Sequence, residues 1–323
     1  MKAKFIGSLA IFLASLSPVT SVYASSYPEK PIRIIVPYTP GDGPDVIARL
    51  IGGKLAERLG QPVVIENRAG ASGQIGLRLT ADAPPDGYTL GVGLVTNVAL
   101  APHAYKSVPY DPLKDFTPVA VASMNYLALV ARPNAPFKTM GEMVEWAKSH
   151  PGKLTIGTTS VGGLPHMSFE LLGHMAGFKF VNVPYKGNGP IVTDLVGGLL
   201  DVGFGSYTSA APHIETGRLR LLGISYPKRD PKLPNLPTMG ETVQGYGSVG
   251  WFGFLAPAGT SSDIVNKLND EINRALMLPD VQETMNTAGL IPTVESPEFF
   301  AKLIKSEYEK FGKLARDIGF KPQ

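Results

Sequence analysis

The regular alternation of short β-branched runs with helical periodicities constrains the fold of this chain more than any other feature. Ile32-Arg33-Ile34-Ile35-Val36 is a β-branched run ended by Pro37, which is typical of a buried parallel strand. From Pro44 to Leu59, apolar residues recur at three- and four-residue spacing, and Gly60 follows as a helix stop. Strand and helix patterns that alternate in this way predict an α/β fold with mostly parallel sheets.

The same alternation continues to the end of the chain. Strands are predicted at 63–65, 88–92, 119–121 and 127–130, and strands of a second sheet at 154–157, 180–183, 201–204 and 219–224. Helices are predicted at 139–148, where Thr139 and Glu142 form a capping box, and at 165–175, 190–196, 262–277 and 297–318. Residues 226–249 are rich in Pro, Gly and charge, and we expect them to lead into a last strand at 251–255.

The N-terminus has the three regions of a secretory signal peptide in the right order. Lys2 and Lys4 precede an apolar run at 5–16, and Val22-Tyr23-Ala24 is a small-x-small cleavage site. This order favours export and cleavage after Ala24 over an uncleaved anchor or a buried strand. About 299 residues would remain (323 minus 24), which is more than one hydrophobic core usually serves and predicts two domains.

Composition excludes several classes of function. The chain has no cysteine, which rules out disulfides, thiolate zinc sites and a thiol nucleophile. The net charge is +3, and removal of Lys2 and Lys4 leaves +1, so no strong electrostatic footprint for nucleic acid is present. The five histidines include no HExxH motif, and we expect neither a metal nor a cofactor.

Two glycine-bearing loops each join the end of a predicted strand to the start of a helix. Backbone amides and the positive helix end favour an anion at such a place, at the sheet edge where open α/β folds bind ligands. The alternative is that both are ordinary strand-to-helix turns, with glycine for geometry and hydroxyls for capping. The loops run from Tyr38 to Asp45, including Gly41, Asp42 and Gly43, and from Thr158 to His166, including Thr159, Ser160, Gly162 and Gly163.

Enzyme motifs fail on spacing. The stretch from Gly41 to Val46 matches two glycines of the dinucleotide fingerprint GxGxxG, but its third glycine position is Val46. Neither Ser72 nor Ser248 lies in a complete GxSxG nucleophile elbow. His166 is interpreted as a polar residue at a helix start near the cleft, and His174 as a surface or packing residue.

Many short segments, in one order over nearly the whole chain after the leader, resemble the Bug family, the TctC-like substrate-binding proteins of tripartite tricarboxylate transporters. The matching segments include Tyr27-Pro28-Glu29-Lys30-Pro31-Ile32-Arg33, Leu59-Gly60-Gln61-Pro62-Val63-Val64-Ile65-Glu66-Asn67-Arg68, Pro85-Asp86-Gly87-Tyr88-Thr89-Leu90, Val183-Pro184-Tyr185-Lys186-Gly187 and Ala256-Pro257-Ala258-Gly259-Thr260.

The resemblance implies a type II periplasmic binding-protein fold, in which two α/β lobes close around a ligand. It implies a first part of lobe 1 at 25–125, lobe 2 at 126–225, and a return to lobe 1 at 226–323, with a hinge near 124–130 and 224–250. It further implies a small carboxylate as ligand and an integral membrane permease of two subunits as partner.

The resemblance also implies that the two loops hold the ligand carboxylate. This sequence departs from the family pattern at Asp42, where a second glycine is common, and at Gly163, where Ser or Thr is common. An inward Asp42 would repel an anion, whereas an outward Asp42 would cap its helix, which is the orientation we favour. Residues at predicted strand ends, namely Thr96, Asn97, Ser206 and Tyr207, are expected to add selectivity.

We therefore expect a periplasmic solute-binding protein that is not an enzyme. An extracytoplasmic sensor for a membrane receptor needs the same closure and stays open as an alternative. An enzyme that uses a nicotinamide cofactor is disfavoured by the leader and by the incomplete fingerprint.

Overall fold

A single long strand, β4 (Phe116–Ala131), runs through both halves of the molecule in the computed structural model, which describes residues 27–229, 234–288 and 290–322. Its first part, 116–126, pairs with β9 (Val249–Pro257), and its last part, 127–131, pairs with β7 (Val202–Ser206) and β8 (Arg220–Ile224). The strands predicted at 119–121 and 127–130 are both part of β4, and only their separation into two short strands was wrong. The intervening residues are polar or mixed, but they remain paired with β9.

The two sheets expected from sequence are joined into one hydrogen-bonded path. The strand order is β2-β1-β3-β9-β4-β7-β5-β6, and β8 and β10 also pair with β4. Parallel pairs occupy the two flanks, and the pairs made by the crossing strands β4 and β9 are antiparallel. The remaining strands are β1 (Ile32–Val36), β2 (Val63–Asn67), β3 (Thr89–Leu94), β5 (Leu154–Thr158), β6 (Phe180–Pro184) and β10 (Ile291–Pro292).

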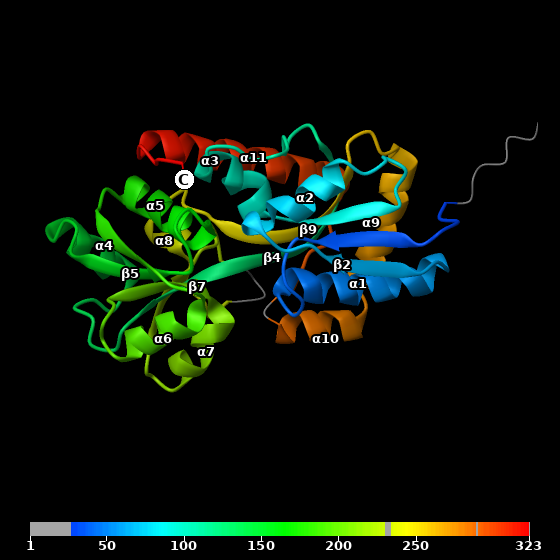
Figure 1. The fold of residues 1–323 in the computed structure, drawn as a ribbon. Helices are drawn as coiled ribbons and strands as arrows, with labels where there is room; N and C mark the ends of the chain where they lie inside the picture. The colour runs from blue at the N-terminus through cyan, green and yellow to red at the C-terminus, as the bar shows by residue number, and fades with distance from the viewer. Residues whose placement is uncertain (1–26, 230–233, 289, 323) are drawn as a thin grey trace, which may run out of the picture.

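Helices cover both faces of each flank, so the molecule has two α/β lobes (Figure 1). Lobe 1 contains β1 to β3, β9, β10 and the first part of β4. Its helices are α1 (Gly43–Leu59), η1 (Ala71–Gly73), α2 (Gln74–Ala81), the π-helical turn η2 (Thr96–Leu100), α3 (Ala101–Ala104), α9 (Ser262–Leu276), α10 (Pro279–Thr287) and α11 (Pro297–Asp317). Lobe 2 contains β5 to β8 with α4 (Met140–Ser149), α5 (Leu164–Ala176), α6 (Asn188–Val196), α7 (Tyr207–Glu215) and α8 (Met239–Thr242).

Each lobe buries apolar side chains on both faces of its sheet. In lobe 1, Ile47 and Ile51 of α1 pack with Leu268 and Ile272 of α9 on one face. On the other face, the residues that pack together come from η2, β9 and α11. In lobe 2, α4 and α5 cover one face and α6 and α7 the other. This three-layer arrangement brings the carboxyl ends of the parallel strands in the two lobes toward each other.

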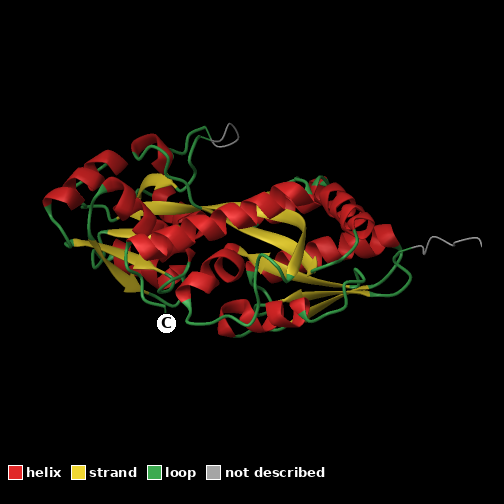
Figure 2. Ribbon diagram, turned by 90° about the horizontal axis from the view of Figure 1, so that it is seen from above, coloured by secondary structure: helices red, strands yellow, loops and turns green. Residues whose placement is uncertain are grey.

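The C-terminal helix reaches from lobe 1 back toward lobe 2 (Figures 1 and 2). Phe320, which follows α11, lies with its ring centroid 6.3 Å from that of His166 on α5. A Cβ at Gly162 would lie 3.3 Å from the Phe320 ring. The end of the chain therefore packs against the second glycine-bearing loop.

Helix ends follow the sequence signals in part. Thr139 and Ser296 accept hydrogen bonds from Glu142 N and Phe299 N, respectively, as N-caps. The predicted capping box is only half formed, because the Glu142 carboxylate accepts from Lys138 N and not from Thr139 N. Sequence reasoning missed several short elements, one of which, α7, is interrupted by proline. They are η1, α2, η2, α3, α7, α8, α10 and β10. The predicted signal peptide at 1–24 lies outside the described residues.

Candidate functional site

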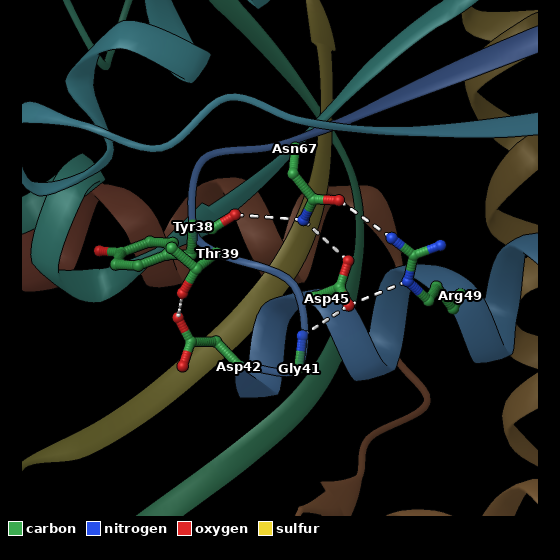
Figure 3. A network of polar contacts seen from close by, with 7 residues as sticks. All are labelled: Tyr38, Thr39, Gly41, Asp42, Asp45, Arg49 and Asn67. Atoms are coloured by element: carbon green, nitrogen blue, oxygen red, sulfur yellow. Dashed lines mark hydrogen bonds and ion pairs between the residues drawn. The ribbon is translucent and has the colours of Figure 1, made fainter.

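The first loop, between β1 and α1, is organised around the buried carboxylate of Asp45 (Figure 3). One carboxylate oxygen accepts from Gly41 N and from Arg49 Nε, both at 2.9 Å. The other accepts from Asn67 Nδ2 at 2.8 Å, and the same amide group donates to Tyr38 O at 3.1 Å. Arg49 also donates to Asn67 Oδ1 at 3.0 Å. This network links the loop, α1 and the end of β2.

The electrostatics of Asp45 match this bracing role. Burial alone would raise the pKa of its carboxyl group, but the hydrogen bonds from Arg49, Gly41 and Asn67 together lower the pKa below its ordinary value. Asp45 is only 2% exposed, and its oxygens already have three donors. It therefore shapes the loop and does not project toward the space between the lobes.

Asp42 occupies the N-cap position of α1 and is exposed, but it makes no side-chain capping hydrogen bond. Its carboxylate accepts from the Thr39 hydroxyl at 2.6 Å instead (Figure 3). Gly41 has a φ of 89°, which a side chain would strain. A Cβ at Gly43 would lie 3.2 Å from Phe252 Cε2, so the start of α1 packs directly behind β9.

Tyr38 and Asn97 lie close together in lobe 1, since a Cβ at Gly73 would lie 2.7 Å from Asn97 Nδ2 and 3.3 Å from Tyr38 Cε2. Thr96 begins the π-helical turn η2. The Tyr38 hydroxyl donates to Ser72 O at 3.4 Å, and burial raises the pKa of its phenol. Asn97 is fully buried, where its Oδ1 accepts from Leu94 N at 2.8 Å. Asn97 Nδ2 has no partner among the described residues. The side chain of Asn97 thus caps the end of β3.

The second loop, between β5 and α5, is held by His166. Gly162 N donates to His166 Nδ1 at 3.0 Å, and His166 Nε2 lies 3.3 Å from Glu170. Thr158 donates its hydroxyl to Asn182 Oδ1 at 2.7 Å. A Cβ at Gly163 would overlap the Ser160 hydroxyl, so Ser160 fills the place that a side chain at 163 would take. His174 is partly exposed and lies 3.7 Å from Asp317.

A cavity of about 500 Å³ lies between the lobes, beside the second loop. Its lobe 2 wall is formed by first turns of helices and strand ends, namely Thr159, Pro165, Asn188, Gly205, Ser206, Tyr207 and Thr208. Its floor is the crossing strand β4 at Asn125, Tyr126 and Leu127, and its lobe 1 wall is formed by Phe252, Asn286, Ala288, Leu290 and Ile291. This volume is in the range of small-molecule sites.

The cavity gathers only part of the predicted set. Thr159, Ser206 and Tyr207 line it. The other predicted residues surround or brace the site and do not line the cavity. They are the first-loop residues and Thr96, Asn97, Thr158, Ser160, Gly162, Gly163 and His166. Sequence reasoning missed Asn125, Asn188 and Phe252. Asn188 could have been found, because it is a polar residue that begins α6 shortly after the end of β6. No local sequence feature marks Phe252 as a cavity residue.

The floor of the cavity coincides with the point where β4 changes partners. Tyr126 pairs with Val249 of β9, and Leu127 pairs with Ser206 of β7. The Tyr126 ring lies 5.7 Å from that of Tyr207 and 5.4 Å from that of Tyr226, measured between centroids. The site and the junction of the lobes therefore share residues.

The described part of the chain contains neither a metal-binding cluster nor a membrane-spanning helix. No group of three or more His, Cys, Asp or Glu side chains there is arranged to hold a metal ion. No helix described is both long enough and apolar enough to cross a bilayer.

Two α/β lobes joined by crossing strands, with a cavity between them, form the architecture of a two-lobed solute-binding protein. The model of the tripartite tricarboxylate transporter family receptor, TctC, matches residues 47–320. The chain belongs to this family, whose members are solute-binding proteins of the periplasm.

Relatives and solved structures agree with this assignment. The chain is 34% identical to the protein BugT of Bordetella pertussis, with 98% of each chain covered. A Rhodopseudomonas palustris protein solved with adipate is 33% identical, with a TM-score of 0.74 over 92% of this chain and 100% of the other. MatC of Rhodopseudomonas palustris, solved with bound malate, is 32% identical, with a TM-score of 0.71 over 89% and 99% of the two chains.

Proposed function

We propose that this protein captures a small organic acid in the cavity between its lobes and delivers the acid to an integral membrane permease of two subunits. The observation that carries the proposal is the convergence of three helix starts, those of α5, α6 and α7, on one wall of the cavity. The adipate and malate bound by two solved relatives support a carboxylate as ligand.

The three helix starts favour an anion for a physical reason. Amides in the first turn of a helix have no partner within the helix, and the helix dipole places partial positive charge there. The N-caps Gly163, Gly187 and Ser206 make no side-chain hydrogen bond to these amides. A carboxylate in the cavity would accept from such groups and would gain from the local potential.

We infer that the site residues have two roles: some contact the ligand and others support the walls of the cavity. Thr159, Asn188, Ser206 and Tyr207 contact the ligand. The loop from Tyr38 to Asp45 supports the wall that holds Phe252, because Asp45 braces the loop and Gly43 packs against the ring. His166 holds the tip of the second loop through Gly162.

The assignment of 25–125 and 226–323 to lobe 1 and of 126–225 to lobe 2, and the cleavage of a signal peptide after Ala24, belong to the same proposal. One part of the return segment is excepted, because Met239, Val243 and Tyr246 pack in the core of lobe 2. The change of strand partners between Tyr126 and Leu127 supports a hinge there. Mass spectrometry of the protein purified from the periplasm would test the cleavage, since a chain that begins at Ser25 is expected.

Ligand-induced stabilisation of the mature protein tests the central proposal. A small acid at 100 times its dissociation constant should add about 2.7 kcal/mol to the free energy of unfolding. Asn188→Ala should weaken this effect, whereas Asn134→Ala, at an exposed loop position away from the cavity, should not. Stabilisation by amines or amides alone, with no response to any acid, would contradict the proposal.

A further inference from the structure

The two walls of the cavity differ in chemistry. On the lobe 2 side, Asn188, Ser206 and Thr208 present an amide and two hydroxyls beside the helix starts. On the lobe 1 side, Phe252, Leu290 and Ile291 present carbon. A ligand that fills the cavity therefore has one polar end and one apolar end.

The polar side offers hydrogen-bond donors to a ligand. The hydroxyls of Ser206 and Thr208 bond each other at 2.7 Å, so one of their two protons stays free to donate. Asn188 Oδ1 accepts from Ser206 N at 3.2 Å, which leaves the Asn188 amide nitrogen to donate. On the floor, Asn125 Oδ1 accepts from the Ser123 hydroxyl at 2.9 Å, so the Asn125 amide nitrogen is also left to donate. A carboxylate, which only accepts, is the complementary group.

The apolar side of the cavity has few groups that could stabilise a second carboxylate of the ligand. Among the described residues, no Lys, Arg or His side chain lines the cavity, and Asn286 is the single polar side chain on the lobe 1 wall. A carboxylate placed there would lose water against carbon without a cationic partner, which is costly. The start of α1 packs closely behind this wall, because a Cβ at Gly43 would lie 3.2 Å from Phe252 and 4.0 Å from Leu290.

We propose that the cavity selects acids with one carboxylate and an apolar body, with the carboxylate held by lobe 2 and the body by Phe252, Leu290 and Ile291. This inference rests on the proposed capture of an organic acid and narrows it. It separates this chain from the solved relatives that hold the dicarboxylates adipate and malate.

Two matched pairs of acids test the proposal by calorimetry on the mature protein. Hexanoate and adipate have the same carbon chain and differ by one carboxylate, and 4-methylbenzoate and terephthalate form a ring pair of the same kind. The better monocarboxylate is expected to bind at least about tenfold more tightly than its dicarboxylate partner, because the second carboxylate is left unpaired. Equal or tighter binding of the dicarboxylates would overturn the selectivity and leave acid capture intact. No binding of any of the four acids would also overturn the selectivity, whereas acid capture itself is decided by the stabilisation measurement on the mature protein.

A gain of charge tests the assignment of the walls. Ile291→Lys places a cation on the lobe 1 wall at a partly exposed position, so folding should be preserved. It is expected to raise the affinity for the dicarboxylate relative to its partner about tenfold. Val294→Lys, on the same segment but 45% exposed and outside the cavity, is the control and should leave the ratio unchanged. An unchanged ratio in Ile291→Lys, with the fold intact by circular dichroism, would overturn the assignment.

Discussion

Replacement of Asp45 by Asn should destabilise lobe 1 without altering the surface of the cavity. The buried carboxylate accepts from Gly41 N, Arg49 Nε and Asn67 Nδ2. An amide keeps one acceptor oxygen and turns an NH₂ group toward donors. A hydrogen bond to a charged group contributes about 1.5–3 kcal/mol, but half-exposed Arg49 remains hydrated and contributes less.

The expected loss for Asp45→Asn is therefore about 2–3 kcal/mol in the free energy of unfolding, or about 5 °C in Tm for a chain of this size. Asp42→Asn is the matched control. It changes an exposed carboxylate whose partner is the Thr39 hydroxyl, so its effect should stay within about 0.5 kcal/mol. Urea unfolding of both variants beside the unmodified protein gives the comparison.

The difference in the free energy of unfolding between the unmodified protein and Asp45→Asn should also depend on pH in a defined direction. The native pKa of Asp45 is lowered, so its contribution is complete above the unfolded-state pKa of about 3.9 and is lost as the pH falls through the native pKa. The stability gap between the unmodified protein and Asp45→Asn should therefore shrink below about pH 3.9. A gap that is absent at neutral pH, or that persists unchanged in acid, would refute the bracing role.

Three further outcomes are expected. Ser296→Ala removes the side-chain cap of α11 and should cost about 1 kcal/mol in urea unfolding, whereas Ser261→Ala, at an N-cap without a side-chain bond, should cost much less. Gly205→Ala should lower acid affinity about tenfold in calorimetry, because its Cβ would overlap Asn188 Oδ1 and displace the amide that the ligand needs; unchanged affinity would contradict the role of Asn188. Burial raises the pKa of Glu307, which Lys310 only partly offsets, so stability should decline as the pH rises above the unfolded-state value of about 4.3. Glu307→Gln should make that decline in stability smaller. An unaltered pH profile of the free energy of unfolding in this variant would exclude Glu307 as the source of the decline.

Much of the fold could be predicted from the sequence because local signals and tertiary structure agree. The β-branched run Ile32–Val36 became the buried strand β1, and the periodicity after Pro44 became α1. The continuity of β4 as one long strand could not be predicted in this way. Its middle carries Ser123, Asn125 and Tyr126, which show no strand periodicity, and only pairing with β9 keeps them extended.

The site was predicted at the level of loops and less well at the level of side chains. Position after a strand identified Thr159 and Ser206, because strand ends meet at one edge. The same rule could not distinguish Asp45, which turns inward to Gly41 and Asn67, from a ligand-facing residue. Phe252 belongs to a strand that follows lobe 2 in the chain, so its place in the cavity depends on topology alone.

The exchange between Ser160 and Gly163 bears on how such receptors are compared. A column-by-column alignment would score position 163 as the loss of a hydroxyl, yet the Ser160 hydroxyl occupies the space of the missing side chain. A hydroxyl three residues earlier in the chain thus lies in the place that a side chain at 163 would take. A comparison of this loop with other receptors by residue identity alone would therefore count as absent a hydroxyl that is present in space.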